Sequence, residues 1–114
     1  MKLRVKRIYE SPSAEDGRRI LVDGVWPRGL SRDKARVDYW ARDIAPSARL
    51  RQWYKHDADK WEEFQRRYFE ELDANAEAVA ELRRQLDEEG TTLLFSSKEE
   101  RFNNAWALKA YLEE

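Results

Sequence analysis

The order of hydrophobic and polar positions along the chain predicts strands separated by helices. Residues 3 to 8 alternate apolar with basic side chains, which is typical of a strand with one buried face. Residues 18 to 23 contain a continuous Ile-Leu-Val run, and residues 91 to 95 read TTLLF. Both runs suit strands that are buried on two faces. A further short strand is expected around residues 39 to 41.

Apolar residues at intervals of three and four predict helices between and after these strands. The clearest repeat begins at Asp59 and Glu62, whose spacing matches a capping box, and continues to Leu72. The helix that starts near Asn75 is expected to end at Gly90. Polar residues typical of helix N-caps precede the remaining predicted helices: Ser31, Ser47 and Asn103.

Strands interspersed with helices predict a small α/β layered fold, with the 114 residues forming a single domain, 1–114. One connection leaves two topologies open. Residues 9 to 17 are fewer than the roughly dozen residues of a usual parallel crossover, so the first two strands either cross over or form a hairpin.

Composition narrows the classes of function. Charged residues make up 39% of the chain, yet its fourteen aromatic residues indicate a folded core. The chain has no cysteine, which excludes disulfides and thiol catalysis, and one histidine, which argues against zinc. We therefore expect neither a metal nor a cofactor. No apolar run approaches the roughly 20 residues of a membrane span, and the first residues lack a secretory h-region, so we expect a cytoplasmic protein without a membrane partner.

Charge is divided unevenly along the chain. Residues 1–57 hold 14 Lys and Arg against 8 Asp and Glu, and residues 58–114 hold 8 against 15. The basic half is expected to face both solvent and the acidic helices, so nucleic-acid binding is not the favoured interpretation. A module that binds nucleic acid or a protein partner stays open as the alternative. The sequence predicts no oligomeric state.

The sequence predicts that any chemistry takes place at the carboxyl edge of the sheet. Ligands bind open α/β sheets beyond the ends of parallel strands, where loops and helix N-termini converge. Asp23 and His56 are the candidate catalytic groups of this region. The predicted ligand-binding residues are Arg7, Trp26, Arg28, Ser96, Ser97, Asn103 and Asn104.

Asp23 is the sharpest candidate, because a carboxylate just past three buried aliphatic residues is partly desolvated and suited to general-base work. The alternative is a structural carboxylate that pairs with Arg7 or Arg28 or caps loop amides. Arg28 lies in a stiff turn between Pro27 and Gly29. It is expected either to grip a carboxylate or phosphate or to staple the loop to Asp23.

The other candidates also have structural alternatives. Trp26 either contacts a ligand or only packs. His56, followed by a carboxylate, either takes part in acid–base chemistry or ends a helix. No nucleophile elbow surrounds Ser96 or Ser97. Each is therefore expected either to stabilise a turn or helix cap or to contact a ligand. Two consecutive asparagines follow, of which one is expected to cap the last helix and the other to reach the ligand.

Several stretches together resemble one known family. They are VKRIY at 5–9, RILVDGVWPRGLS at 19–31, DIAPS at 43–47, RQWYKHD at 51–57, WEEFQRRY at 61–68, and LLFSS with NNA near the end. Over nearly its whole length the chain resembles the bacterial family called domain of unknown function 488, in its short YeaO-like branch. The resemblance implies a mostly parallel sheet, here of three or four strands flanked by helices. It favours the crossover over the hairpin and implies no established reaction.

Two departures from that family bear on function. Relatives usually carry arginine at the position of Gly24, so an anion grip shared with Arg28 is expected to be weaker here. Relatives also commonly have histidine at the position of Phe102, and a mechanism that uses it cannot operate in this chain. The leading hypothesis is a site for a small anionic molecule, with Arg7 and Arg28 as anion grips. Acid–base or hydrolytic chemistry at Asp23 is a further part of that hypothesis.

Overall fold

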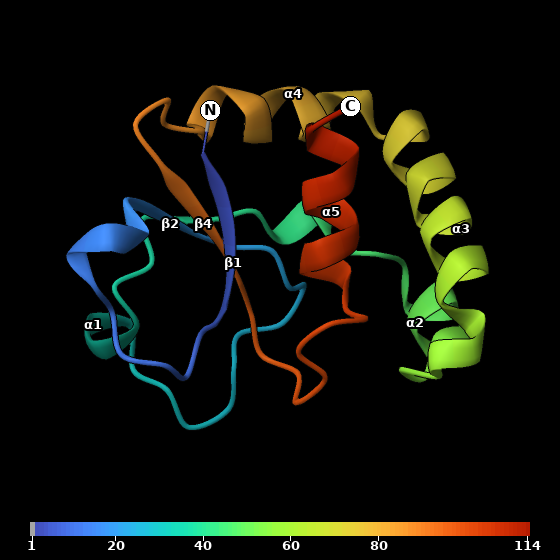
Figure 1. Ribbon diagram of the computed structural model, residues 1–114, viewed down its shortest axis with the longest axis horizontal. Helices are drawn as coiled ribbons and strands as arrows, with labels where there is room; N and C mark the ends of the chain where they lie inside the picture. The colour runs from blue at the N-terminus through green and yellow to red at the C-terminus, as the bar shows by residue number, and fades with distance from the viewer. Residues whose placement is uncertain (1) are drawn as a thin grey trace.

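The computed structural model describes residues 2–114 and contains a four-stranded parallel sheet with most helices on one side (Figure 1). The strands are β1 (Leu3–Arg7), β2 (Arg18–Leu21), β3 (Tyr39–Trp40) and β4 (Thr91–Phe95). Their order across the sheet is β1-β4-β2-β3, and each neighbouring pair runs parallel. The predicted α/β fold with a parallel sheet is confirmed.

One short helix, α1, lies between β2 and β3, three helices connect β3 to β4, and α5 follows β4. The central helix, α5, packs against β1 and β4, and α3 lies on the outer side of α5 (Figure 1). Short 3-10 turns occupy residues 14–16, 42–44 and 58–60. The helices are α1 (Arg32–Ala35), α2 (Ala48–Tyr54), α3 (Trp61–Ala74), α4 (Ala76–Gln85) and α5 (Asn104–Leu112).

The hairpin alternative for the first two strands is wrong, because β4 lies between β1 and β2. The strands β1 and β2 both run parallel to β4, so the short connection from Ile8 to Gly17 is a crossover. It contains one 3-10 turn, Ala14–Asp16, which Ser13 caps. A single capped turn is therefore sufficient to carry the chain across one intervening strand.

Two helix boundaries differ from the predictions. The residue that caps the turn before α3 is Asp57, not Asp59: its carboxylate accepts a hydrogen bond from the Asp59 amide at 3.0 Å, and α3 begins at Trp61. The α4 helix ends at Gln85, well before Gly90. Residues 87–90 form a separate turn, closed by a hydrogen bond of 3.1 Å from the Gly90 amide to the Asp87 carbonyl. The apolar repeat of α4 continues to Leu86, so the sequence did not distinguish the end of the helix from the turn that precedes β4.

The helix-covered face of the sheet holds the main apolar core. Ile20, Val22 and Leu93 are fully buried there, together with Phe95. The central strand β4 is buried along its whole length, because helices cover one face and loops the other. Each such side chain contributes roughly 1.5–3 kcal/mol to folding.

The opposite face is covered by α1 and by loops, and it combines a small apolar cluster with buried charge. Ile8, Leu21, Ala35 and Leu94 make up the apolar part, against which Trp40 packs. Beside this cluster lies a buried carboxylate with its partners, which we call the Asp16 cluster. Its members are Lys6, Asp16, Arg19 and Thr92.

Every polar group of the Asp16 cluster has a protein partner. Lys6 Nζ donates to both oxygens of Asp16 at 3.1 Å, and Arg19 pairs with the same carboxylate. Thr92 Oγ1 donates to the Asp16 carbonyl at 2.7 Å, which ties the cluster to β4. Burial alone raises the pKa of Asp16, but hydrogen bonds from the Ser13 amide, Lys6 and Arg19 outweigh it and hold the pKa below its ordinary value.

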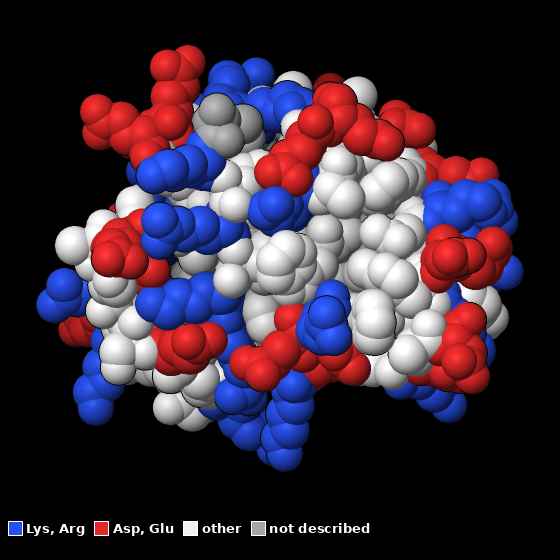
Figure 2. Space-filling model, in the orientation of Figure 1, with Lys and Arg blue, Asp and Glu red and all other residues white. Residues whose placement is uncertain are grey.

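Basic side chains line one edge of the sheet. Figure 2 shows Lys and Arg side chains in a column over β1, with acidic side chains gathered at the top of the same view. Since β1 is an edge strand, charged residues such as Arg4 oppose pairing with another sheet. Among the helices of residues 2–114, none combines the length and the apolar character needed to cross a bilayer.

Candidate functional site

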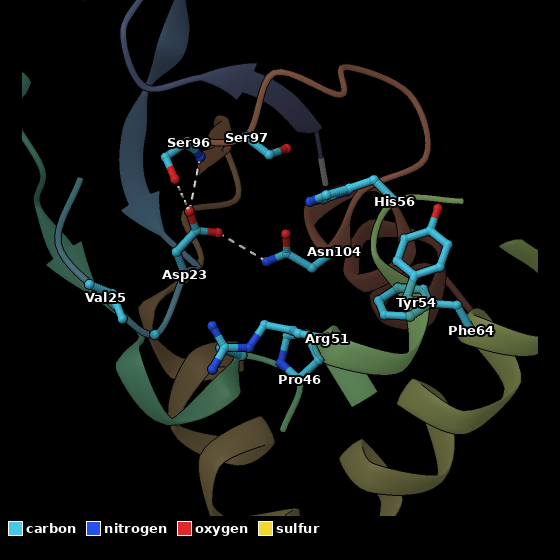
Figure 3. Close-up of a pocket in the computed structure, with 12 residues that line it drawn as sticks. Asp23, Val25, Pro46, Arg51, Tyr54, His56, Phe64, Ser96, Ser97 and Asn104 are labelled. Atoms are coloured by element: carbon cyan, nitrogen blue, oxygen red, sulfur yellow. Dashed lines mark hydrogen bonds between the residues drawn. The ribbon is translucent and has the colours of Figure 1, made fainter. Parts of the chain in front are cut away.

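A cavity of about 200 Å³ opens at the carboxyl ends of β2 and β4 (Figure 3). Parallel strands end at the same edge of a sheet, so the loops that follow them meet there. The end of α2 and the first turn of α5 complete the wall. The lining residues are Asp23, Gly24, Val25, Ala45, Pro46, Arg51, Tyr54, His56, Phe64, Ser96, Ser97 and Asn104.

Asp23 accepts three hydrogen bonds from neutral donors at the edge of this cavity. Its Oδ2 accepts from the amide and the hydroxyl of Ser96 at 2.9 and 2.7 Å, and its Oδ1 accepts from Asn104 Nδ2 at 3.1 Å (Figure 3). No Lys or Arg of residues 2–114 forms an ion pair with Asp23. Asp23 thus joins the loop after β4 to the start of α5, while its charge has no cationic partner there.

The two asparagines at the start of α5 have different roles. Asn103 is fully buried and caps the helix, because its side chain accepts a hydrogen bond from the Trp106 amide at 3.1 Å. Asn104 lines the cavity, and its Nδ2 donates to Asp23 at 3.1 Å and to the Val22 carbonyl at 3.2 Å. The cap sets the first turn of α5, and that turn carries Asn104 to the strand ends.

Two basic side chains enter the cavity from α2 and from the turn after it. The position of α2 is set by Ser47, which caps the helix while its amide and hydroxyl donate to the Glu71 carboxylate of α3 at 2.8 and 2.6 Å. The Arg51 guanidinium and the His56 ring both point inward, toward the strand ends (Figure 3). Within the described chain, neither side chain forms an ion pair or a side-chain hydrogen bond. Hydrogen bonds from the Arg101 and Phe102 amides lower the pKa of Glu99, and the charge of His56 is a smaller influence in the same direction.

His56 reaches the cavity through a backbone conformation that is uncommon for a residue with a side chain. Lys55 and His56 have φ angles of 47° and 54°, both in the left-handed region. Each such residue costs of the order of 1–2 kcal/mol. Two of them in succession end α2 abruptly and turn the imidazole inward. Backbone strain of this kind is concentrated at functional sites.

The floor of the cavity is aromatic and apolar. Tyr54 is buried and stacks on Phe64 with ring centroids 4.2 Å apart, and its hydroxyl donates to the Phe102 carbonyl at 2.6 Å. Burial, with smaller contributions from the charges of Glu99 and Asp57, raises the pKa of Tyr54 to about 12. The phenol therefore stays neutral near pH 7 and serves as a structural wall.

The chemical groups at the cavity are one carboxylate, one guanidinium, one imidazole, two serine hydroxyls, the Tyr54 phenol and one amide. In residues 2–114 no three His, Asp or Glu side chains lie close enough together to hold a metal ion. This set of groups is suited to holding a small polar molecule by charge and hydrogen bonds.

Two arginines predicted as anion grips lie outside the cavity. Arg7 Nε donates to the Ser97 carbonyl at 2.9 Å, and its guanidinium lies 4.7 Å from the centre of the Tyr9 ring. Arg7 therefore holds the loop after β4 through the backbone of Ser97 and does not line the cavity. Arg28 is exposed, and its carbonyl accepts a hydrogen bond from the Tyr9 hydroxyl at 2.8 Å. Neither arginine pairs with Asp23, so the predicted loop staple is absent from the described chain.

Trp26 packs on the loop-covered face of the sheet, away from the cavity. Its Nε1 donates to the Leu30 carbonyl at 2.7 Å, and its ring meets Trp40 edge-on at 5.6 Å. The Arg32 guanidinium lies 4.4 Å from the centre of the Trp26 ring. Of the alternatives for Trp26, this geometry matches packing.

Sequence reasoning missed Arg51 as a site residue. On α2 it occupies a solvent-side position of an amphipathic helix, where an arginine is indistinguishable from its neighbours by pattern. The only available signal was its place in the RQWYKHD stretch, five residues before His56. The structure brings together Asp23, His56, Ser96, Ser97 and Asn104 from the prediction and adds Arg51 to them.

Both family departures lie at or beside the cavity. Gly24 lines it, and a Cβ added there would stand 3.4 Å from the Ala45 Cβ, so a side chain at this position would border the same space. The Phe102 ring packs against the Trp61 ring with centroids 5.4 Å apart, and the Phe102 carbonyl accepts the hydrogen bond from the Tyr54 hydroxyl. The chain therefore has a small residue and an apolar one at the two positions.

Similarity to other proteins agrees with the resemblance seen in the sequence. The chain is 32% identical over 112 residues to the uncharacterized protein YeaO of Escherichia coli (strain K12), which covers 98% of this chain and 97% of YeaO. It is 48% identical over 83 residues to the uncharacterized protein Rv3073c of Mycobacterium tuberculosis (strain ATCC 25618 / H37Rv), covering 73% and 70% of the two chains. The uncharacterized protein Mb3100c of Mycobacterium bovis matches to the same extent.

No solved structure matches the chain significantly. The family described as "Inactive DUF488-N3 subclade" matches residues 2–114, which is the whole of the described chain. Together with the relationship to YeaO over 98% of its length, this match shows that the chain belongs to the DUF488 family, in its N3 subclade.

Proposed function

We propose that this protein binds a small molecule through an anionic group, in the cavity at the carboxyl ends of β2 and β4, and does not catalyse a reaction on it. Arg51 and His56 hold the anion. The observation that carries this proposal is that both side chains point into the cavity without a protein partner in residues 2–114. A guanidinium forms its strongest hydrogen bonds with a carboxylate or phosphate. We also propose that the protein acts in the cytoplasm, in keeping with its composition.

Three features favour binding over catalysis. The Asp23 carboxylate accepts three hydrogen bonds from the protein, so about one of its roughly four acceptor positions is left, which is enough to accept one hydrogen bond from a ligand. The Ser96 hydroxyl donates to Asp23, so no histidine activates it as a nucleophile. The description of the matching family as inactive points the same way.

The alternative of a nucleic-acid module has less support. Three of the basic side chains in the first half of the chain pair with carboxylates of the same half: Arg4 pairs with Glu15, and Lys6 and Arg19 pair with Asp16. Phosphate-backbone binding depends on several free basic side chains on one surface. The small cavity at the strand ends offers a better-defined place for a ligand.

The direct test compares ligand binding by the wild type and Arg51→Ala. A panel of small carboxylates and phosphates is screened by thermal shift, and the compounds that bind are measured by calorimetry. Losing a charged hydrogen-bond partner costs roughly 1.5–3 kcal/mol, so the affinity of Arg51→Ala should fall by about tenfold or more.

The matched control is Arg49→Ala, on the same helix but outside the cavity. It should bind as tightly as the wild type, since general loss of positive charge is equal in the two variants. Equal affinities in all three proteins, or no binding of any compound in the panel, would overturn the proposal.

A further inference from the structure

We infer that the ligand is a small zwitterion of the amino acid class, with its carboxylate at Arg51 and its protonated amine at Asp23. This inference rests on the proposed function, since Arg51 and His56 hold the anionic end. It adds the chemistry of the other end of the ligand.

Asn104 presents an acceptor to the cavity. Its Nδ2 donates to the Val22 carbonyl at 3.2 Å and to the Asp23 carboxylate at 3.1 Å. A carbonyl and a carboxylate can only accept, so the amide nitrogen must face them and the amide orientation is determined. Both N–H groups are then used, and Oδ1 is the remaining polar atom. Figure 3 shows this oxygen on the side facing Ser97 and His56.

The two serines have the same polarity. The Ser96 hydroxyl donates its hydrogen to Asp23 at 2.7 Å, and the Ser97 hydroxyl donates to the Glu99 carbonyl at 3.2 Å. A hydroxyl has one hydrogen, so both oxygens can only accept from a ligand. The side chains on this wall therefore offer hydrogen-bond acceptors, and they fit a ligand group that donates. A protonated amine carries three, which matches Asp23, Asn104 and one serine.

A ligand hydroxyl could also donate hydrogen bonds to this wall, but the charges at the cavity favour a protonated amine. Asp23 and Arg51 both line the cavity, and within residues 2–114 neither forms an ion pair. A ligand with only an anionic group neutralises Arg51 but places a second negative charge near Asp23, which is unfavourable. A zwitterion neutralises both residues at once.

The size and lining of the cavity limit the ligand. Its volume of about 200 Å³ lies below the roughly 300–1,000 Å³ of pockets that enclose drug-sized ligands. Val25, Ala45 and Pro46 supply an apolar wall for a short aliphatic stem. An amino acid meets the requirements of charge, polarity and size together.

The experiment measures, by calorimetry on the full chain, matched sets of compounds that differ only in the amine. The proteinogenic amino acids and β-alanine are screened first. Glycine, L-alanine and β-alanine are then compared with the hydroxy acids glycolate, lactate and hydroxypropanoate, and with the simple acids acetate and propanoate. We expect the amino compound to bind at least tenfold more tightly than its hydroxy and simple counterparts.

The Asp23→Asn variant tests the partner of the amine, with the exposed Asp33→Asn as its control. Asp23→Asn should reduce the preference for the amino compound, and Asp33→Asn should leave it unchanged. If Asp23→Asn does not fold, the ligand series on the wild type decides alone.

The outcomes separate the two proposals. Acids that bind as tightly as their amino counterparts would overturn the zwitterion and leave the anion site standing. A lack of binding by every acid, amino acid and phosphate would overturn both. Binding of amino acids that is lost in Arg51→Ala and weakened in Asp23→Asn would support both.

Discussion

The Asp16 cluster and the Asp23 cavity each centre on an aspartate beside the parallel sheet, yet their surroundings are opposite. Asp16 has an exposed side-chain fraction of 6%, and it pairs with Lys6 and Arg19. Asp23 accepts only neutral donors, while a guanidinium without a partner lines the same cavity. Charges that satisfy one another hold the loop-covered face together, whereas charges left apart around a cavity are available to a ligand.

The first and largest expected effect breaks the Asp16 cluster. Asp16→Asn leaves the buried guanidinium of Arg19 without its carboxylate, and breaking a buried pair in this way costs about 3–5 kcal/mol of unfolding free energy. Chemical denaturation measures the change. The control is Glu15→Gln: its side chain is 81% exposed and 3.6 Å from Arg4, so the change should stay within about 0.5 kcal/mol. A small effect of Asp16→Asn would show that the cluster is not structural.

The pH dependence of stability gives a second way to distinguish the two aspartates. The folded-state pKa of Asp16 lies below its ordinary value of 3.8. Its contribution to stability is therefore present above pH 3.8 and is lost as the pH falls through the folded-state pKa. From pH 3.8 downward the wild type should lose more stability than Asp16→Asn, which denaturation curves across this range measure. Parallel losses in the two proteins would contradict the assignment.

Asp23→Asn should have a smaller effect on stability than Asp16→Asn. Its hydrogen-bond partners are neutral and reach a cavity, so the variant should lose about 1–2 kcal/mol, mainly from the donor-to-donor contact with Asn104. Denaturation of the two variants side by side checks the order. If Asp23→Asn were the more destabilising of the two, the distinction between a structural and an available carboxylate would fail.

The smallest effect concerns the strained turn at the cavity. Glycine tolerates the left-handed φ angles of Lys55 and His56, so Lys55→Gly and His56→Gly should each stabilise the fold by roughly 0.5–1 kcal/mol. Only His56→Gly should weaken the binding of the anionic ligand, because Lys55 does not line the cavity. Thermal denaturation and calorimetry measure the two properties separately. Equal ligand affinities in these variants would remove His56 from the site.

Much of the candidate site could be predicted because the rule behind it is topological. Asp23 ends one predicted strand and Ser96 directly follows another, and parallel strands deliver such residues to the same edge. Arg51 escaped prediction because it comes from a helix packed beside that edge, and its side chain looks like any solvated arginine in sequence. Arg28 follows β2 too, but its turn carries the guanidinium to the surface.

The sequence by itself determined the strands, the helices and the family, because burial imposes a period of two on strands and 3.6 on helices, and local residues cap them. Only the tertiary structure decided that β4 separates β1 from β2, and that Arg51 faces Asp23 across a cavity. Both depend on contacts between residues far apart in the chain. Periodicity records whether a residue is buried, and it contains no information about which distant residue lies opposite.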